Sequence, residues 1–180
     1  MIFTKSNWIK LSVLSLLFWG MACILPLNLT FDSTFDLTFN LTPQAFALDY
    51  NKEILIEADF SGKDLTDSSF TKANLRDSNF SNSNLQGVRF FATNLESANL
   101  RNANLRYATL DSARLVKADL TNAVLEGAFA SNARFDGAII DGADFTDVLL
   151  RSDEQDKLCK LAKGTNPTTG RNTRDTLFCS

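Results

Sequence analysis

The residues of this 180-residue chain best suited to chemistry are a group of carboxylates near residue 140 and three cysteines. The carboxylates are Asp136, Asp141, Asp144 and Asp147. Such a group is typical of paired-carboxylate hydrolases and of calcium sites. The chain has no histidine, however, so the commonest general base and metal ligand is missing. Aspartates are also frequent in exposed turns, where they need no function. We therefore predict no catalytic residues, no metal site and no cofactor, and we expect that the protein is not an enzyme.

Residues 1–47 contain the three parts of a secretory signal peptide, which are a basic head, an apolar middle and a small-x-small end. Lys5 and Lys10 are the only charged side chains before Asp32, and residues 11–29 carry no charge. The segment ends in Ala-Phe-Ala at Ala47. We therefore expect cleavage between Ala47 and Leu48, followed by export of the mature chain.

The signal is longer than usual because residues 30–41 hold three tandem copies of a four-residue unit, TF[DN]x. Two alternatives stay open. The apolar run has close to the ~20 residues that a membrane span needs, so it can remain as an anchor. Lipidation of Cys23 is the other, although "GMAC" lacks the aliphatic residue usual three places before a lipoprotein cysteine.

Cys159 and Cys179 remain in the mature chain as an even pair, which in an oxidising compartment predicts a disulfide. The bond would close a loop of about 20 residues and stabilise the fold by roughly 3 kcal/mol. The spacing is not C-x-x-C, so a thioredoxin-type active site is not indicated. We favour a structural disulfide, and a redox-regulated bond is the alternative.

A period of five residues organises the middle of the chain. Leucine, phenylalanine or isoleucine recurs at every fifth position from Leu55 to Leu150, except at Ala130, and a small residue lies two places earlier. Five residues advance an α-helix by about 1.4 turns, and an odd period places successive side chains on opposite faces of a strand. The bulky residues converge only if the chain turns by a quarter circuit every five residues. Four quintets then close one coil, and residues twenty apart stack.

Tandem A[DN]LXX units of this kind resemble the pentapeptide-repeat family. The resemblance implies an all-β solenoid, a right-handed quadrilateral β-helix, here of about five coils. The expected organisation is a cleaved signal peptide at 1–47, a β-helix with a short N-terminal lid at 48–150, and a helical, disulfide-linked cap at 151–180. Twenty central positions in one register, from Leu55 to Leu150, carry the likeness.

Stacking of residues twenty apart predicts four interior ladders. One of them is the core ladder Leu65, Leu85, Leu105, Leu125 and Phe145. A second ladder is weakened at Ala130. There Phe129 either swings inward or lies outside against Leu149.

Beyond Leu150 the pattern becomes helical, as expected for a cap over an open solenoid end. Ser152 and Gln155 have the spacing of a capping box, and Gly164 is a typical helix stop. The expected apolar face of this helix is Leu158, Cys159, Leu161 and Ala162. Thr173 is the expected cap of a second short element. The whole tail resembles that of thylakoid-lumen pentapeptide-repeat proteins, which favours the thylakoid lumen or the periplasm as the location.

The outward positions are the ones free to contact a partner. Arg101, Arg106 and Tyr107 form the candidate partner surface. We expect ion pairs between coils from Arg76 to Glu96 and from Arg106 to Glu126. Further apolar residues expected to point outward are Phe91, Val116, Val124 and Ile139.

The leading functional hypothesis is a non-enzymatic, exported structural or interaction protein with an unidentified protein partner, favoured as a monomer. A net charge of −3 gives no basic face for nucleic acid, and no membrane span remains after cleavage. One alternative is a redox-responsive lumenal protein that is switched through Cys159 and Cys179. The other, disfavoured, is a DNA mimic that binds gyrase, as some members of the family do.

Overall fold

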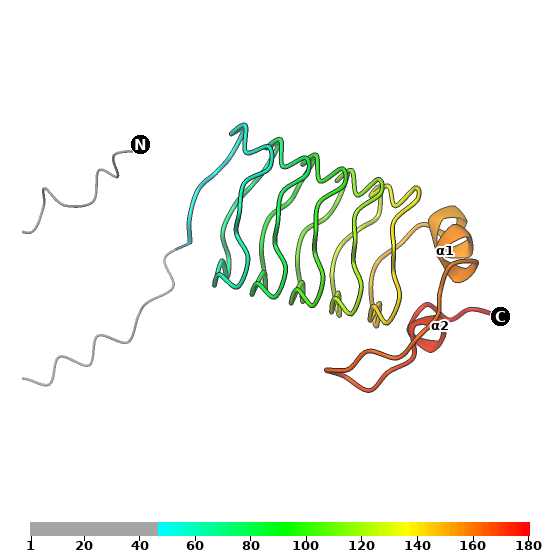
Figure 1. Cartoon of the computed structure of the whole chain (residues 1–180). Coiled ribbons are helices and arrows are strands. Elements are labelled where there is room, and N and C mark those ends of the chain that lie inside the picture. Colours follow the sequence, from blue (N-terminus) through cyan, green and yellow to red (C-terminus); the bar gives the residue numbers. More distant parts are fainter. Residues whose placement is uncertain (1–46) are drawn as a thin grey trace, which may run out of the picture. The chain divides into compact units, whose positions relative to one another are not determined.

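The computed structural model describes residues 47–180. The predictions for the signal peptide, the membrane anchor and Cys23 lie outside these residues. In the described part the chain forms a stack of coils from residue 49 to residue 150, followed by two short helices (Figure 1). Neither helix is long and apolar enough to cross a membrane.

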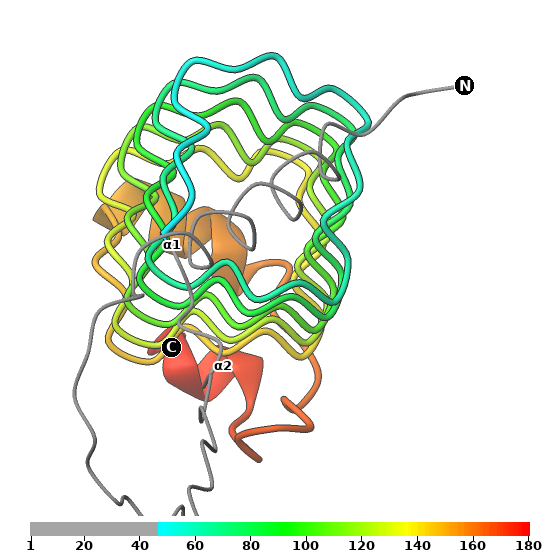
Figure 2. The ribbon, with the colours of Figure 1, turned by 90° about the vertical axis from the view of Figure 1, so that its left-hand side faces the viewer.

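Parallel backbone pairing between residues twenty apart joins each coil to the next. The pairs run without interruption from Asp49 with Ser69 to Phe129 with Leu149. A turn follows every five residues, so each circuit has four sides, and the view along the stack shows the sides of successive coils in line (Figure 2). The pairing contains single bridges in place of long strands, because each side is only five residues long.

The quintet that ends at Leu105 shows why this sequence turns so often. Asn102 has a φ of 55°, which places it in the left-handed region, where asparagine is tolerated better than most residues. The turn is closed by the amide of Ala103, which donates to the carbonyl of Leu100 at 3.1 Å. Two residues later Leu105 donates to Val124 at 2.7 Å in the next coil. One local bond and several inter-coil bonds thus fix each side of the coil.

The interior is filled by the bulky and the small residue of each quintet. The core ladder has exposed fractions of 2% or less: Leu65, Leu85, Leu105, Leu125 and Phe145. The small residues two places earlier are also buried, including Ala103 and Ala123. At the weak point Ala130 is buried, whereas Phe129 and Leu149 are half-exposed and paired side by side outside. Phe129 therefore does not fill the ladder.

The repeat begins one quintet earlier than we predicted. Tyr50 stacks on Phe70 with ring centroids 4.8 Å apart, and its amide donates to the carbonyl of Ser69 at 2.7 Å. Residues 48–54 are therefore the first side of the first coil and not a separate lid. The sequence prediction missed this side because tyrosine takes the place of leucine or phenylalanine at residue 50.

Asparagine side chains link the coils on the outside, a role that the sequence analysis did not foresee. The amide of Asn99 donates to Asn79 at 3.1 Å, and Asn79 donates in turn to Asp59 at 3.1 Å. A second ladder follows the turns, from Asn122 to Asn102 at 3.2 Å. Because each amide both donates and accepts, one residue type can bond the coil above and the coil below.

The two helices of the cap are α1 at Ser152–Cys159 and α2 at Thr173–Thr176. The predicted capping box is wrong, because Arg151 is the N-cap residue of α1 and no side chain caps it. The prediction for α2 was also one residue out, since Asn172 is the N-cap and accepts from the amide of Arg174. The α1 helix ends at Cys159, well before Gly164.

Candidate functional site

The cap satisfies backbone donors that the last coil leaves open. Glu154 of α1 is 4% exposed, and its Oε1 accepts from the amide of Phe135 at 2.8 Å. The hydroxyl of Thr176 in α2 accepts from the amide of Phe145 at 3.1 Å. The carbonyl of Lys163 accepts from Gly142 at 2.8 Å. Oxygen acceptors from the segment after Leu150 thus bind three amides of the last coil, in the quintets that end at Phe135 and Phe145.

The face that α1 buries is narrower than predicted. Leu158 is buried against the core at 1% exposure, and Ala162 is buried beside it. Leu161 is 47% exposed and does not belong to this face. Leu161 and Ala162 both follow the end of α1, and Ala162 keeps the buried side because its amide donates to the carbonyl of Leu158 at 2.9 Å.

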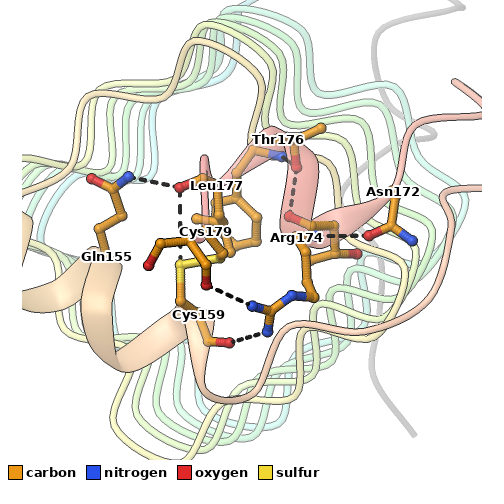
Figure 3. Close-up of a disulfide and its surroundings, with 10 residues drawn as sticks. Gln155, Cys159, Asn172, Arg174, Thr176, Leu177 and Cys179 are labelled. Atoms are coloured by element: carbon orange, nitrogen blue, oxygen red, sulfur yellow. Dashed lines mark hydrogen bonds between the residues drawn. A yellow bond between two sulfur atoms is a disulfide. The ribbon is translucent and has the colours of Figure 1, made fainter.

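A disulfide joins the end of α1 to the residues that follow α2, as expected for Cys159 and Cys179 (Figure 3). Arg174 holds the same two segments without a covalent bond. Its guanidinium donates to the carbonyl of Cys159 at 3.0 Å and to the carbonyl of Ser180 at 3.2 Å. Gln155, assigned above to a capping box, instead donates to the carbonyl of Leu177 at 2.6 Å.

The segment between the helices folds back over one side of the coil stack. Asn166 is completely buried, and its Nδ2 donates to the carbonyls of Asn122, Ala123 and Gly142 at 3.1, 3.2 and 2.8 Å. Val124 was predicted to be exposed at an outward position, but its side chain is only 3% exposed. It occupies an outward position of its quintet, on the side where Asn166 binds.

Arg171 connects the fold-back segment to two carboxylates of the coil. It donates to Glu126 at 2.8 Å, and its Nε lies 3.0 Å from Oδ2 of Asp144. Asp144 is completely buried, and Oδ2 has this ion pair but no aligned hydrogen bond within residues 47–180. Oδ1 accepts from the amide and the hydroxyl of Thr146.

These contacts lower the pKa of both carboxyl groups. The hydrogen bond from Arg171 holds the pKa of Glu126 below its ordinary value, and Arg106 adds to the effect. Burial pushes the pKa of Asp144 upward, but hydrogen bonds from Thr146 and the charge of Arg171 outweigh it and leave that pKa lowered. Both groups are therefore ionised at neutral pH.

The attachment of the fold-back segment should weaken in acid. A carboxyl whose folded-state pKa is depressed stabilises the fold above its unfolded-state pKa of about 4 and loses that effect as the pH falls through the folded-state value. We expect hydrogen exchange in residues 163–172 to accelerate as the pH falls below about 4, after correction for the intrinsic exchange rate. Arg171→Gln should already show fast exchange at pH 7, with little further change in acid.

Arg134→Gln is the matched control, because within residues 47–180 the ion-pair partner of Arg134 is the exposed Asp136 on its own coil. Its exchange profile in residues 163–172 should follow that of the unmodified protein. Equal loosening in both variants would show that the loss of any arginine, and not the bridge of Arg171, detaches the segment.

Arg101, Arg106 and Tyr107 lie on neighbouring turns of one coil, but the two arginines are already engaged. Arg101 pairs with Asp119 at 3.0 Å, and Arg106 pairs with Glu126 at 3.3 Å, as predicted for Arg106. Tyr107 is 56% exposed. Among the described residues it is therefore the member of this surface with the most freedom to contact a partner.

Other outward predictions have mixed outcomes. Phe91 and Ile139 are exposed as expected, and Val116 is half-buried. The predicted pair of Arg76 with Glu96 is wrong, because Arg76 pairs with Asp77 in its own turn and Glu96 pairs with Arg114. Arg114 approaches Glu96 from the next coil, at the outward position just before a ladder residue.

Three of the four carboxylates near residue 140 have ion-pair partners within residues 47–180. Asp136, Asp141 and Asp144 pair with Arg134, Lys163 and Arg171 respectively. Within residues 47–180 no three histidine, cysteine or acidic side chains are placed to hold a metal ion. The pairs of Asp141 and Asp144 attach the segment that follows α1 to the coil stack.

Four residues central to the cap were not identified from the sequence: Glu154, Asn166, Arg171 and Arg174. They lie outside the five-residue register, so no periodicity marks them. Their partners are mostly backbone groups or side chains far away along the chain. The only local signal is that Glu154 lies in the first turn of a predictable helix, where an acid is expected because it interacts favourably with the helix dipole.

Comparison with known proteins agrees with this architecture. The family profile described as "Pentapeptide repeat region" matches residues 53–130, and "Pentapeptide repeats (8 copies)" matches residues 113–151. A pentapeptide repeat protein from the thylakoid lumen of Arabidopsis thaliana has a crystal structure that is similar, with 46% identity and a TM-score of 0.72. That comparison covers 73% of this chain and 91% of the relative.

Two further relatives match over shorter stretches. The chain is 62% identical over 37 residues to thylakoid lumenal 15 kDa protein 1, chloroplastic, of Arabidopsis thaliana, which is 21% of this chain and 16% of the relative. HetL, from the cyanobacterium Nostoc, is 27% identical with a TM-score of 0.45 over 53% of this chain and 48% of HetL. The register of five, the pairing at twenty and the extensive match to a solved relative together show that the chain belongs to the pentapeptide repeat family.

Proposed function

We propose that the protein is an exported, non-enzymatic interaction module, a right-handed quadrilateral β-helix of about five coils that presents a rigid four-sided surface to a protein partner. One observation carries the proposal. The inward residues and the backbone are committed to the core and to pairing between coils from residue 49 to residue 149, so the variable outward positions are what differs along the stack. A regular, rigid stack whose variable side chains all point outward favours binding of a partner.

The thylakoid lumen is the location we propose, because two relatives in Arabidopsis thaliana are described as thylakoid-lumen proteins. We expect the exported protein to begin at Leu48, and N-terminal sequencing after expression in an exporting host checks this directly. A mature chain that still contains residues 11–29 would instead favour the retained anchor. The carbonyl of Leu48 accepts from Ser69 at 2.8 Å, so cleavage before this residue leaves the first coil complete.

The surface around Tyr107 is the proposed contact with the partner. We expect that photo-crosslinking from this surface in a lumenal extract captures a defined partner and that Tyr107→Ala weakens the capture at least fivefold, a loss typical of an exposed aromatic anchor. Arg101→Ala and Arg106→Ala should have smaller effects, because both arginines are paired within the chain.

Phe91→Ala is the matched control, since Phe91 is an exposed aromatic residue in a different turn of the preceding coil. It should leave the crosslinked product unchanged. If Tyr107→Ala and Phe91→Ala reduce capture equally, the proposed surface is not the specific contact.

Redox control through Cys159 and Cys179 is a second candidate, favoured by one feature. The disulfide lines a surface cavity of about 460 Å³ that Lys160, Arg174 and Asp156 also line, so a reductant can approach it beside two cations and one carboxylate. Cationic surroundings favour a thiolate, the form that attacks or leaves in exchange. A reduction potential below about −300 mV would mark the bond as structural and would exclude this function.

A further inference from the structure

The two ends of the coil stack differ in the backbone groups that they present. Toward the N-terminal side, the quintet 71–75 directs the carbonyls of Thr71 and Asn74, which accept from Lys52 and Leu55 at 2.9 and 2.8 Å. The amide of Asn74 points the same way and donates to Glu53 at 2.9 Å. Each quintet thus presents two acceptors and one donor to the coil before it.

The opposite side has the reverse composition. Toward the next coil the same quintet directs the amides of Lys72 and Leu75, which donate at 2.9 and 2.8 Å, and the carbonyl of Ala73, which accepts at 3.0 Å. The C-terminal end is therefore rich in donors. The cap meets it with acceptors, namely the Glu154 carboxylate, the Thr176 hydroxyl and the Lys163 carbonyl.

The N-terminal end presents the acceptor-rich side, and no segment of residues 47–180 covers it. Within that range the edge amides of Ile54, Asp59 and Asp64 have no hydrogen-bond partner. The edge carbonyls without a partner in the same range are those of Asn51, Ile54, Ile56, Asp59, Ser61, Asp64 and Thr66. Ile54, Asp59 and Asp64 lie on three successive sides of the coil, and each offers both groups to solvent, so one added strand can pair with any one of these sides.

Charge reinforces the excess of acceptors at this end. Residues 48–68 contain six carboxylates against two lysines, a net charge of −4. The backbone amide of Ser61 and the side chain of Thr66 lower the pKa values of Asp59 and Asp64, which therefore stay ionised at neutral pH. None of the six takes part in an ion pair within residues 47–180, whereas Asp141, Asp144 and Glu154 at the other end of the stack are each paired.

Apolar side chains lie on the same coil. Ile54 is 77% exposed and Ile56 is 38% exposed. A strand added to an edge gains affinity from its backbone bonds and specificity from alternate side chains. An isoleucine beside carboxylates suits a strand that alternates apolar and cationic residues.

We propose that the N-terminal end of the coil stack, residues 48–66, is a docking edge for an extended segment of a partner protein that carries lysine or arginine. The segment adds a strand to the first coil and supplies cations to its carboxylates. A second copy of this chain is disfavoured, because it would bring two edges of net −4 together. Residues 1–46 are disfavoured as well, since their two lysines are balanced by two aspartates. This edge is separate from the surface around Tyr107, so either can fail without the other.

The test uses the chain recovered from an exporting host and two synthetic peptides, acetyl-KVKVKVK-amide and acetyl-EVEVEVE-amide. We expect the lysine peptide, at millimolar concentration or below, to slow hydrogen exchange of the edge amide on the side to which it pairs, which is that of Ile54, Asp59 or Asp64. The glutamate peptide should have no effect. Exchange in residues 131–150, under the cap, should not respond to either peptide.

Glu53→Lys with Glu57→Lys should weaken binding of the lysine peptide at least about tenfold. Glu57 lies at a turn position with a φ of 58°, and Lys72 and Lys117 occupy equivalent positions, so the fold accepts lysine there. Asp156→Lys with Asp175→Lys, in the cap, changes the net charge equally and should leave binding intact.

Three results would overturn the proposal. One is no protection of the edge amides by the lysine peptide, and another is equal weakening in both double variants, which would indicate nonspecific attraction. The third is a dimer in light scattering that dissociates on Ile54→Lys, which would assign the edge to a second copy.

Discussion

Leu105→Ala is expected to lower the free energy of unfolding by about 2–5 kcal/mol, the range for a leucine removed from a well-packed core. Leu105 is fully buried at the middle of the core ladder, between Leu85 and Leu125, which are also fully buried. Backbone pairing fixes the neighbouring coils, so the surroundings have little room to collapse into the space. Chemical denaturation followed by circular dichroism measures the change.

Leu161→Ala is the matched control for the same chemical change. Leu161 is 47% exposed and follows the end of α1, so its truncation should alter stability by no more than about 0.5 kcal/mol. If the two variants lose similar stability, the ladder is not the source of the fold's stability. Residue 130 is an alanine in the native chain, but its surroundings differ from those of Leu105. Leu105 lies between two fully buried leucines, whereas Leu150, the next residue of the ladder after Ala130, is only half-buried.

The register of the coil could be predicted because it is encoded locally and repeated. Each quintet specifies its own turn and its own inward side chains, so an error at one unit is corrected by its neighbours. That redundancy placed Leu105 and its ladder correctly. It failed at Tyr50, where a single substitution at the first unit hid the start of the repeat.

The cap could be predicted as a helical element but not in its contacts. Ser152 and Thr173 each have the residue type of a cap, yet each lies one residue inside its helix. With α1 beginning at Ser152, Glu154 reaches the amide of Phe135. This contact forms because the last coil leaves that amide without a backbone partner in residues 47–180, which the sequence around Glu154 does not reveal. Val124 is the clearest case, since its burial coincides with the docking of Asn166, a residue far along the chain.

Loss of the Cys159–Cys179 bond is expected to loosen one part of the cap while the coil stays intact. A closed loop of this size stabilises by roughly 3 kcal/mol, which corresponds to about a hundredfold change in local opening. Cys159→Ser with Cys179→Ser should therefore speed exchange of the Phe145 amide about a hundredfold, because Thr176 of α2 is its acceptor. The amide of Leu105 should exchange as before.

The effect should be confined to α2 because the two helices are attached differently. The α1 helix continues directly from the last coil, and Glu154 binds Phe135, so it keeps its position without the disulfide. The α2 helix has four residues, too few to persist alone. Apart from the fold-back segment, it is held beside α1 by Arg174 and Gln155, which bond backbone carbonyls across the two segments.

Thr176→Val distinguishes the disulfide from the hydrogen bond between Thr176 and the amide of Phe145. It removes the acceptor of the Phe145 amide and leaves the disulfide in place, so that amide should exchange faster while the other amides of α2 remain protected. In the double serine variant all of α2 should lose protection together. If the serine variant instead lowers the global unfolding free energy by the full amount, cap and coil form one cooperative unit. Reduction of the bond would then report on the whole fold, and a redox switch confined to the cap would not be physically possible.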